Sequence, residues 1–183
     1  YISPTEFTRQ FSAKRKPGKD MLRLVSFESS LTLTGMNSDD RMRIKPSQQF
    51  DVILGLIAQV AKLSGGQASV PASLQAFVAK YADVANKLGV DSKLFSKVAK
   101  ELWENRGKSL VISGGLAAQT EMAVQTQVAV NLLNSILQND GKTVDYDNSF
   151  ETYAGSFASL EKLVGEMNAG KVKTLIIHNV NPG

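Results

Sequence analysis

The side chains with the greatest chemical capacity are few in this sequence. Cysteine is absent, and His178 is the only histidine. A thiolate metal site, an iron–sulfur cluster, a disulfide and a cysteine nucleophile therefore have no ligands or nucleophile within these 183 residues. His178 follows an apolar run with no positioned carboxylate or nucleophile, and a histidine there usually bonds the neighbouring backbone. We expect no catalytic residue and no metal ligand in the chain.

A group of polar side chains follows the apolar run Leu22 to Phe27. Glu28 ends this run, and Thr32 and Asp39 come soon after it. In a doubly wound sheet, an acidic residue at the end of a strand often binds a ribose or a base edge. Local capping and turn hydrogen bonds explain the same residues, and their spacing alone favours that alternative.

A pair of glycines offers a second possible ligand contact. Gly114 and Gly115 follow an apolar run and precede a helical pattern, so backbone N–H groups there can approach a phosphate. A tight turn is the commoner use of such a pair. The sequence also lacks GxGxxG and GxxxxGK[ST], so nucleoside triphosphate hydrolysis has no support.

The elements that would position these residues alternate between strands and helices. Strands are expected at 22–27, 109–113, 142–146 and 174–178, and helices after Ser3, from Pro46 to Gly65, over 74–88, from Ser92 to Gly107, over about 120–139 and from Ser156 to Gly170. The runs are continuously apolar, which is typical of parallel strands that are buried on both faces. The sequence therefore predicts a three-layer αβα, Rossmann-like domain with a mostly parallel sheet. Val25, Val111 and Ile176 should lie on neighbouring strands.

Length and composition favour one domain over 1–183, since the chain is 43% hydrophobic and 21% charged. It opens on Tyr1 and closes on Asn181-Pro182-Gly183, so we expect a piece cut from a larger protein. No apolar run approaches the ~20 residues that span a bilayer, so no direct membrane span is expected.

The net charge of +4 raises the question of a nucleic-acid partner. Lys14, Arg15, Lys16 and Lys19 form the only dense basic cluster, beside Pro17-Gly18, and a solvated loop explains it. Aromatic residues do not interleave with these cations as a stacking surface requires. We therefore expect no nucleic-acid partner.

Several motifs, taken in order, resemble the central nucleotide-binding domain of the molybdopterin oxidoreductase family. They are Val25-Ser26-Phe27-Glu28, Thr32, Thr34, Ser38-Asp39, Lys45-Pro46-Ser47, Leu110 to Gly115, Asn139-Asp140-Gly141-Lys142, Leu175-Ile176-Ile177 and Asn181-Pro182. A narrower likeness, in Ile2 to Phe7, Leu31 to Gly35 and Met167 to Lys171, is to the iron–sulfur and molybdopterin-like subunit of alternative complex III, a quinol-oxidising respiratory complex.

The resemblance implies a domain of a Tat-exported subunit on the periplasmic side of the inner membrane. Its partners would be other domains of the same chain and subunits of a membrane-associated electron-transfer complex, with iron–sulfur clusters elsewhere in the polypeptide. If the family site is retained, Glu28, Thr32, Asp39, Gly114, Gly115 and Asn181 would bind molybdopterin guanine dinucleotide.

Departures from the family pattern favour loss of that cofactor. Leu116 stands where a second glycine is usual, and Asn179 and Val180 replace glycines before Asn181. Bulky side chains there obstruct the approach of a pyrophosphate or pterin. We therefore expect a structural domain without cofactor. The alternatives are the nucleotide-binding domain of an active molybdenum oxidoreductase and an independent small-ligand binding module.

Overall fold

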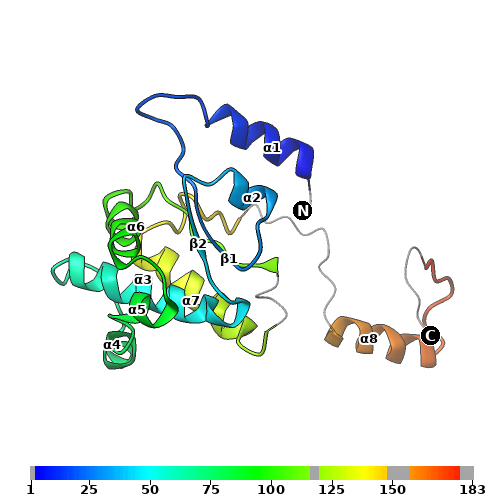
Figure 1. Ribbon diagram of the computed structural model, residues 1–183. Coiled ribbons are helices and arrows are strands. Elements are labelled where there is room, and N and C mark those ends of the chain that lie inside the picture. The colour runs from blue at the N-terminus through cyan, green and yellow to red at the C-terminus, as the bar shows by residue number, and fades with distance from the viewer. Residues whose placement is uncertain (1–2, 116–119, 148–156, 178–183) are drawn as a thin grey trace. The chain divides into compact units, whose positions relative to one another are not determined.

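The computed structural model describes residues 3–115, 120–147 and 157–177, which fall into two units, 3–147 and 157–177 (Figure 1). The first unit contains α1 (Pro4–Ala13), β1 (Val25–Glu28), α2 (Leu33–Met36), β2 (Asp40–Arg43), η1 (Pro46–Gln48), α3 (Gln49–Leu63), α4 (Ala72–Ala79), α5 (Val84–Leu88), α6 (Ser92–Glu104) and α7 (Ala123–Ile136). The second contains α8 (Phe157–Asn168). The expectation of one domain over 1–183 stays a prediction.

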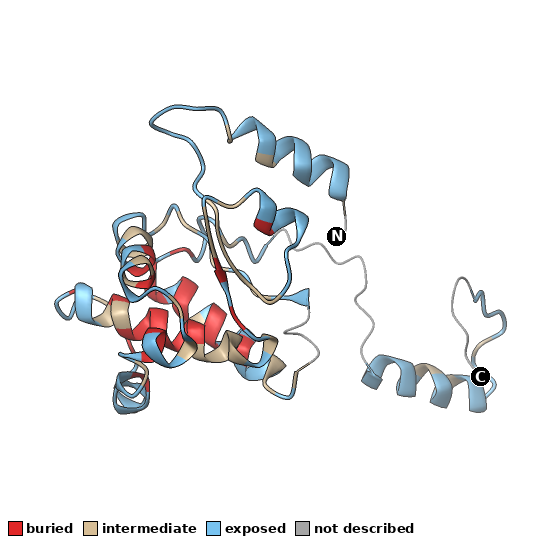
Figure 2. Cartoon of the chain, viewed as in Figure 1, coloured by how far each residue is buried: buried red, intermediate tan, exposed pale blue. Residues whose placement is uncertain are grey.

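The core of the first unit forms around α3. Every residue from Val52 to Ala58 is buried, as is Val60, so this helix is covered on all sides rather than along one stripe. α6 and α7 pack along it, and Figure 2 shows the buried residues gathered on these helices. Gly55 lets α5 and α6 approach α3 closely, because a Cβ at this position would lie 2.2 Å from Val84 Cγ1 on α5 and 3.1 Å from Phe95 Cζ on α6.

The sheet consists of β1 and β2, which pair in parallel with Val25 opposite Asp40 and Glu28 opposite Arg43. The short helix α2 lies in the connection between them, so the unit is β–α–β. Phe27 on β1 packs edge-on against Phe95 on α6, with ring centroids 5.9 Å apart. The chain is thus a mixed α/β protein with a small parallel sheet.

The other three expected strands do not form in the described residues. The segment 109–113 is extended, but side chains from α7 rather than a neighbouring strand bond its backbone. In 142–146 there is one isolated bridge, Asp140 with Val144, within a tight turn. Residues 174–177 contain no strand, and His178 lies outside the described residues. Strands need a partner backbone, which an apolar run alone does not supply.

The expected helices form, with local differences. The pattern over 74–88 divides into α4 and α5, with Gly89 as the left-handed C-cap at φ +69°. Asp91 caps α6, accepting from the N–H groups of Lys93 and Leu94. At the start of α1, Ser3 makes no side-chain bond to the backbone and instead donates to Glu6 at 3.4 Å, so its hydroxyl does not cap the helix.

Two further properties of the helices are the exposure of α8 and the absence, among the described residues, of a helix that could cross a bilayer. α8 contains no buried residue, and its Phe157, Leu160 and Val164 are exposed within its own unit. No helix in the described ranges has the length and apolar character to cross a bilayer.

Candidate functional site

The polar cluster expected after β1 is centred on Glu28, the last residue of that strand. Thr32 caps α2, its hydroxyl accepting from the Gly35 N–H at 3.0 Å. The same hydroxyl donates to Glu28 Oε2 at 2.6 Å, and the Thr32 N–H donates to Oε1 at 3.3 Å. Glu28 therefore holds the turn that begins α2.

Two further residues enclose the Glu28 carboxylate. Arg41 on β2 donates from Nε to Oε1 at 2.5 Å, so the neighbouring strand supplies the counter-ion. Gly35 fits directly against the carboxylate, because a Cβ at that position would lie 1.8 Å from Oε1. The Glu28 side chain is only 13% exposed.

The electrostatics of Glu28 follow from these contacts. Partial burial on its own would raise the pKa of the carboxyl, but the hydrogen bonds from Thr32 and Arg41 outweigh burial and lower it below its usual value. The group is thus a carboxylate committed to three internal donors. Such a group is a poor general acid and has little capacity left for a ligand.

Asp39 lies at the opposite end of the sheet from Glu28. It precedes β2, and its backbone and side chain bond the backbone of Leu24, the residue before β1, at 2.8 Å each. At a strand rise of ~3.3 Å per residue, Leu24 and Glu28 are about 13 Å apart along β1. Asp39 and Glu28 were expected in one site, and the structure separates them.

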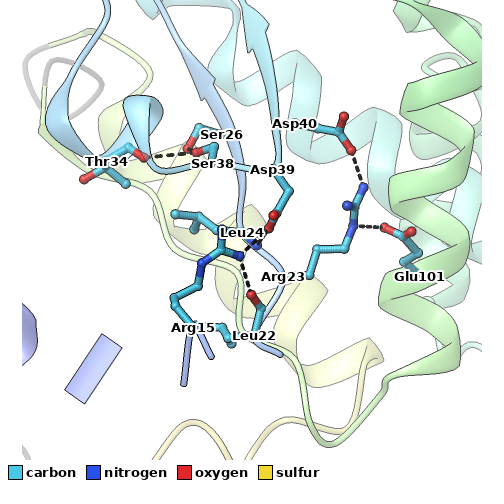
Figure 3. Close-up of polar contacts among 10 residues, drawn as sticks. All are labelled: Arg15, Leu22, Arg23, Leu24, Ser26, Thr34, Ser38, Asp39, Asp40 and Glu101. Carbon is cyan, nitrogen blue, oxygen red and sulfur yellow. Dashed lines mark hydrogen bonds and ion pairs between the residues drawn. The ribbon is translucent and has the colours of Figure 1, made fainter. Parts of the chain in front are cut away.

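Asp39 also receives a cation from the loop after α1 (Figure 3). Arg15 Nη1 donates to Asp39 Oδ2 at 2.7 Å and to the Leu22 carbonyl at 2.6 Å. The hydrogen bond from Arg15, followed by that from the Leu24 N–H, lowers the pKa of Asp39. The carboxylate therefore closes the loop between α1 and the sheet.

A second ion-pair cluster stands beside the first (Figure 3). Arg23 donates from Nε to Glu101 of α6 at 2.6 Å and from Nη2 to Asp40 of β2. Burial opposes the charge of Arg23, but its bonds to Glu101 and Asp40 prevail and raise its pKa. This arginine joins the sheet to the helical layer, which is a structural role.

The glycine pair lies in open space beyond the extended segment 109–113. A Cβ at Gly114 or Gly115 would meet nothing within 4 Å, and Gly115 has φ +64°. Ser113 donates to Gln49 at the start of α3 at 2.8 Å, and its carbonyl accepts from Gln127 of α7. Among the described residues, Glu28 bonds Thr32 and Arg41 and neither glycine. Asn181, Leu116 and Val180 lie outside the described residues.

Sequence reasoning missed the residues that complete these clusters. Arg41 belongs to no recognised motif. An arginine on a strand that neighbours an acidic strand end could have predicted an ion pair between the two strands. Asn134 was also missed, and Asn139 was noted only as part of a family motif, because a buried asparagine can be recognised only once its surroundings in the fold are known.

The arrangement offers little for catalysis or metal binding. In the ranges that the structure describes, no three His, Asp or Glu side chains are grouped to hold a metal ion. One open hollow, of about 380 Å³, is lined by Gln48, Asp51, Lys80, Tyr81, Val84, Lys87 and Leu88. It contains none of the expected site residues.

Comparison with known proteins yields no relative: no protein-family model, no curated protein and no solved structure matches this chain.

Proposed function

We propose that this chain is a structural domain of a molybdopterin oxidoreductase-like subunit in a membrane-associated respiratory electron-transfer complex. The proposal rests on the order of motifs from Val25-Ser26-Phe27-Glu28 to Asn181-Pro182. Its work is packing and assembly with other domains and subunits, and electrons pass through iron–sulfur clusters elsewhere in the polypeptide, on the periplasmic side of the inner membrane.

The observation that carries the structural role is the use of the two family carboxylates. Glu28 accepts from Thr32 and Arg41, and Asp39 accepts from Arg15 and the Leu24 N–H, at opposite ends of the sheet. A guanine or ribose that used both would have to displace internal donors and span the strands. These internal bonds support the proposal that the chain holds no molybdopterin guanine dinucleotide, and we assign no step to that cofactor.

The full fold that we propose is the three-layer αβα, Rossmann-like one. Its support is the segment 109–113, where alternate residues differ in backbone hydrogen bonding and in exposure. Val111 bonds α7, whereas the N–H and C=O groups of Leu110 and Ile112 make no hydrogen bond in the described part of the chain, and these side chains are exposed. Unpaired N–H and C=O groups along one edge of a segment are what a strand offers to a neighbouring strand, so 109–113 can pair with a strand from another part of the subunit.

Hydrogen exchange tests this part of the proposal. In the complete subunit the Leu110 and Ile112 amides should exchange at least about tenfold more slowly than in this chain alone, because strand pairing protects them. Equal rates in the two samples would mean that 109–113 is not a strand of a larger sheet.

The alternative function is a nucleotide-binding domain of an active molybdenum enzyme, and the cofactor content of the complete subunit decides between the two. We expect molybdenum, tungsten and released pterin fluorescence far below one equivalent per subunit. Near-stoichiometric metal with pterin would establish the enzyme instead.

An independent ligand-binding module is the third class, and it can be tested on this chain. We expect guanosine diphosphate at high excess to leave the melting temperature unchanged. A ligand that binds only the folded state would raise the melting temperature by mass action. A concentration-dependent rise would identify a nucleotide module.

A further inference from the structure

The helix α1 and the basic loop that follows it are unusual in how little of their surface is covered. α1 has no buried residue, and Figure 2 shows most of it exposed. Phe7 and Phe11 lie one turn apart on the same face, and Phe7 is 36% exposed. The loop adds Met21 and Leu22, which are 38% and 43% exposed. Apolar side chains therefore emerge beside a basic cluster.

Internal bonds hold this loop in a compact form. The Leu22 N–H donates to the Lys14 carbonyl at 2.9 Å, and the Met21 N–H donates to the Gly18 carbonyl at 3.3 Å. Arg15 fastens the closed loop to Asp39 and stands 5.8 Å from the Phe11 ring. Lys14 and Leu22 are thus adjacent, and the remaining lysines lie on the same small loop.

The cations of the loop and Arg23, which follows it, divide within the described part of the chain into those that form ion pairs and those that do not. Arg15 and Arg23 are engaged with Asp39, Asp40 and Glu101. Lys14, Lys16 and Lys19 are exposed and form no ion pair with any residue in the described ranges. The guanidinium groups of Arg15 and Arg23 are thus bonded internally, whereas the three lysine ammonium groups of the loop are exposed.

We propose that α1 and the loop 14–22 bind the surface of an anionic phospholipid bilayer. Lysines attract a layer of negative headgroups without a fixed partner geometry, and Met21 and Leu22 can enter the boundary between headgroups and acyl chains. This inference goes beyond the proposed function and does not depend on it, because it uses only local charge and exposure.

A bilayer suits this surface better than the other anionic partners. Specific protein carboxylates and phosphates are usually held by the arginine fork, and the one arginine of the loop 14–22, Arg15, already bonds Asp39. Nucleic acid gains from aromatic side chains interleaved with cations, and none lies within the loop. Exposed aliphatic side chains beside lysines match a lipid interface.

Vesicle binding of the full 183-residue chain tests the proposal. Wild type should bind vesicles of phosphatidylcholine with one quarter phosphatidylglycerol and should not bind pure phosphatidylcholine. The triple variant Lys14→Gln, Lys16→Gln, Lys19→Gln should bind roughly a hundredfold more weakly, since each lysine near an anionic surface contributes about fivefold. Higher salt should reduce wild-type binding.

A matched triple variant separates local charge from net charge. Lys80→Gln, Lys87→Gln, Lys93→Gln removes the same charge from exposed positions on other helices, and it should change binding less than about threefold. An equal loss in both triple variants would overturn the proposal, as would equal wild-type binding to both vesicle types. Tighter binding to duplex DNA than to the anionic vesicles would also overturn it.

Insertion of the loop can be measured separately, because the chain has no cysteine of its own. An environment-sensitive fluorophore on Met21→Cys should shift to the blue when anionic vesicles are added, and the same label on Ser92→Cys should not. Matching responses at the two positions would contradict docking through this loop.

Discussion

The Asn134 side chain on α7 bonds both backbone groups of Val111. Its Nδ2 donates to the Val111 carbonyl at 2.8 Å, and its Oδ1 accepts from the Val111 N–H at 3.0 Å. Asn139 extends the contact, donating to Asn134 at 3.0 Å and accepting from the Gly107 N–H at 3.1 Å. A side-chain amide thus replaces a neighbouring strand and holds the extended segment 109–113 on the helix.

The first prediction concerns this contact. Asn134→Ala should destabilise the first unit by about 3 kcal/mol, because it removes the two hydrogen bonds to Val111 and the one from Asn139 and leaves backbone groups of Val111 unpaired in a partly buried place. Urea unfolding followed by the fluorescence of Trp103, the only tryptophan, measures this. Asn131→Ala, at an exposed position of the same helix, should stay within about 0.5 kcal/mol of wild type.

The second prediction concerns Gly35. Gly35→Ala should cost about 2 kcal/mol or more, because the new Cβ would overlap the Glu28 carboxylate and break its bonds to Thr32 and Arg41. Gly114→Ala is the control, since a Cβ there meets open space. If the two variants unfold at the same urea concentration, the Glu28 cluster does not contribute to stability.

The third prediction concerns the packing of α3 against α5. Gly55→Ala should destabilise by about 2 kcal/mol, as overlap with Val84 outweighs the gain of about 1 kcal/mol in helix propensity. Adding Val84→Ala should recover part of the loss, because it removes the overlapping methyl group. A double-mutant cycle measures the coupling, and strictly additive effects would show that the two residues do not meet.

The fourth prediction concerns acid. Glu28 and Asp39 have pKa values below their ordinary 4.5 and 3.8 when folded, so their stabilising effect is complete above those values and is lost as pH falls through the lower folded ones. Wild type should lose stability from about pH 5 downward. The Glu28→Gln, Asp39→Asn variant should be less stable at neutral pH and should lose less on acidification. Parallel pH profiles would contradict this assignment.

Local signals in the sequence were enough to place most helices. Asp91 and Gly89 mark the boundary between α6 and α5 because capping satisfies backbone groups within a few residues of the cap. Phe50, Ile53 and Ile57 recur at helical spacing in the sequence and lie on α3, although burial on all sides exceeds what one stripe predicts. Capping and helical periodicity are properties of a short segment, so they can be read without the fold.

Only the tertiary structure decided which polar residues contact one another. The parallel register leaves Asp39 bonded to Leu24 at one end of the sheet and Glu28 opposite Arg43 at the other, where Arg41 reaches the Glu28 carboxylate. Two carboxylates that looked like one site therefore belong to opposite ends of the sheet. It also assigned Val111 to Asn134 rather than to a neighbouring strand. Both outcomes depend on partners distant in sequence, and an apolar run or an acidic residue carries no information about which partner it will meet.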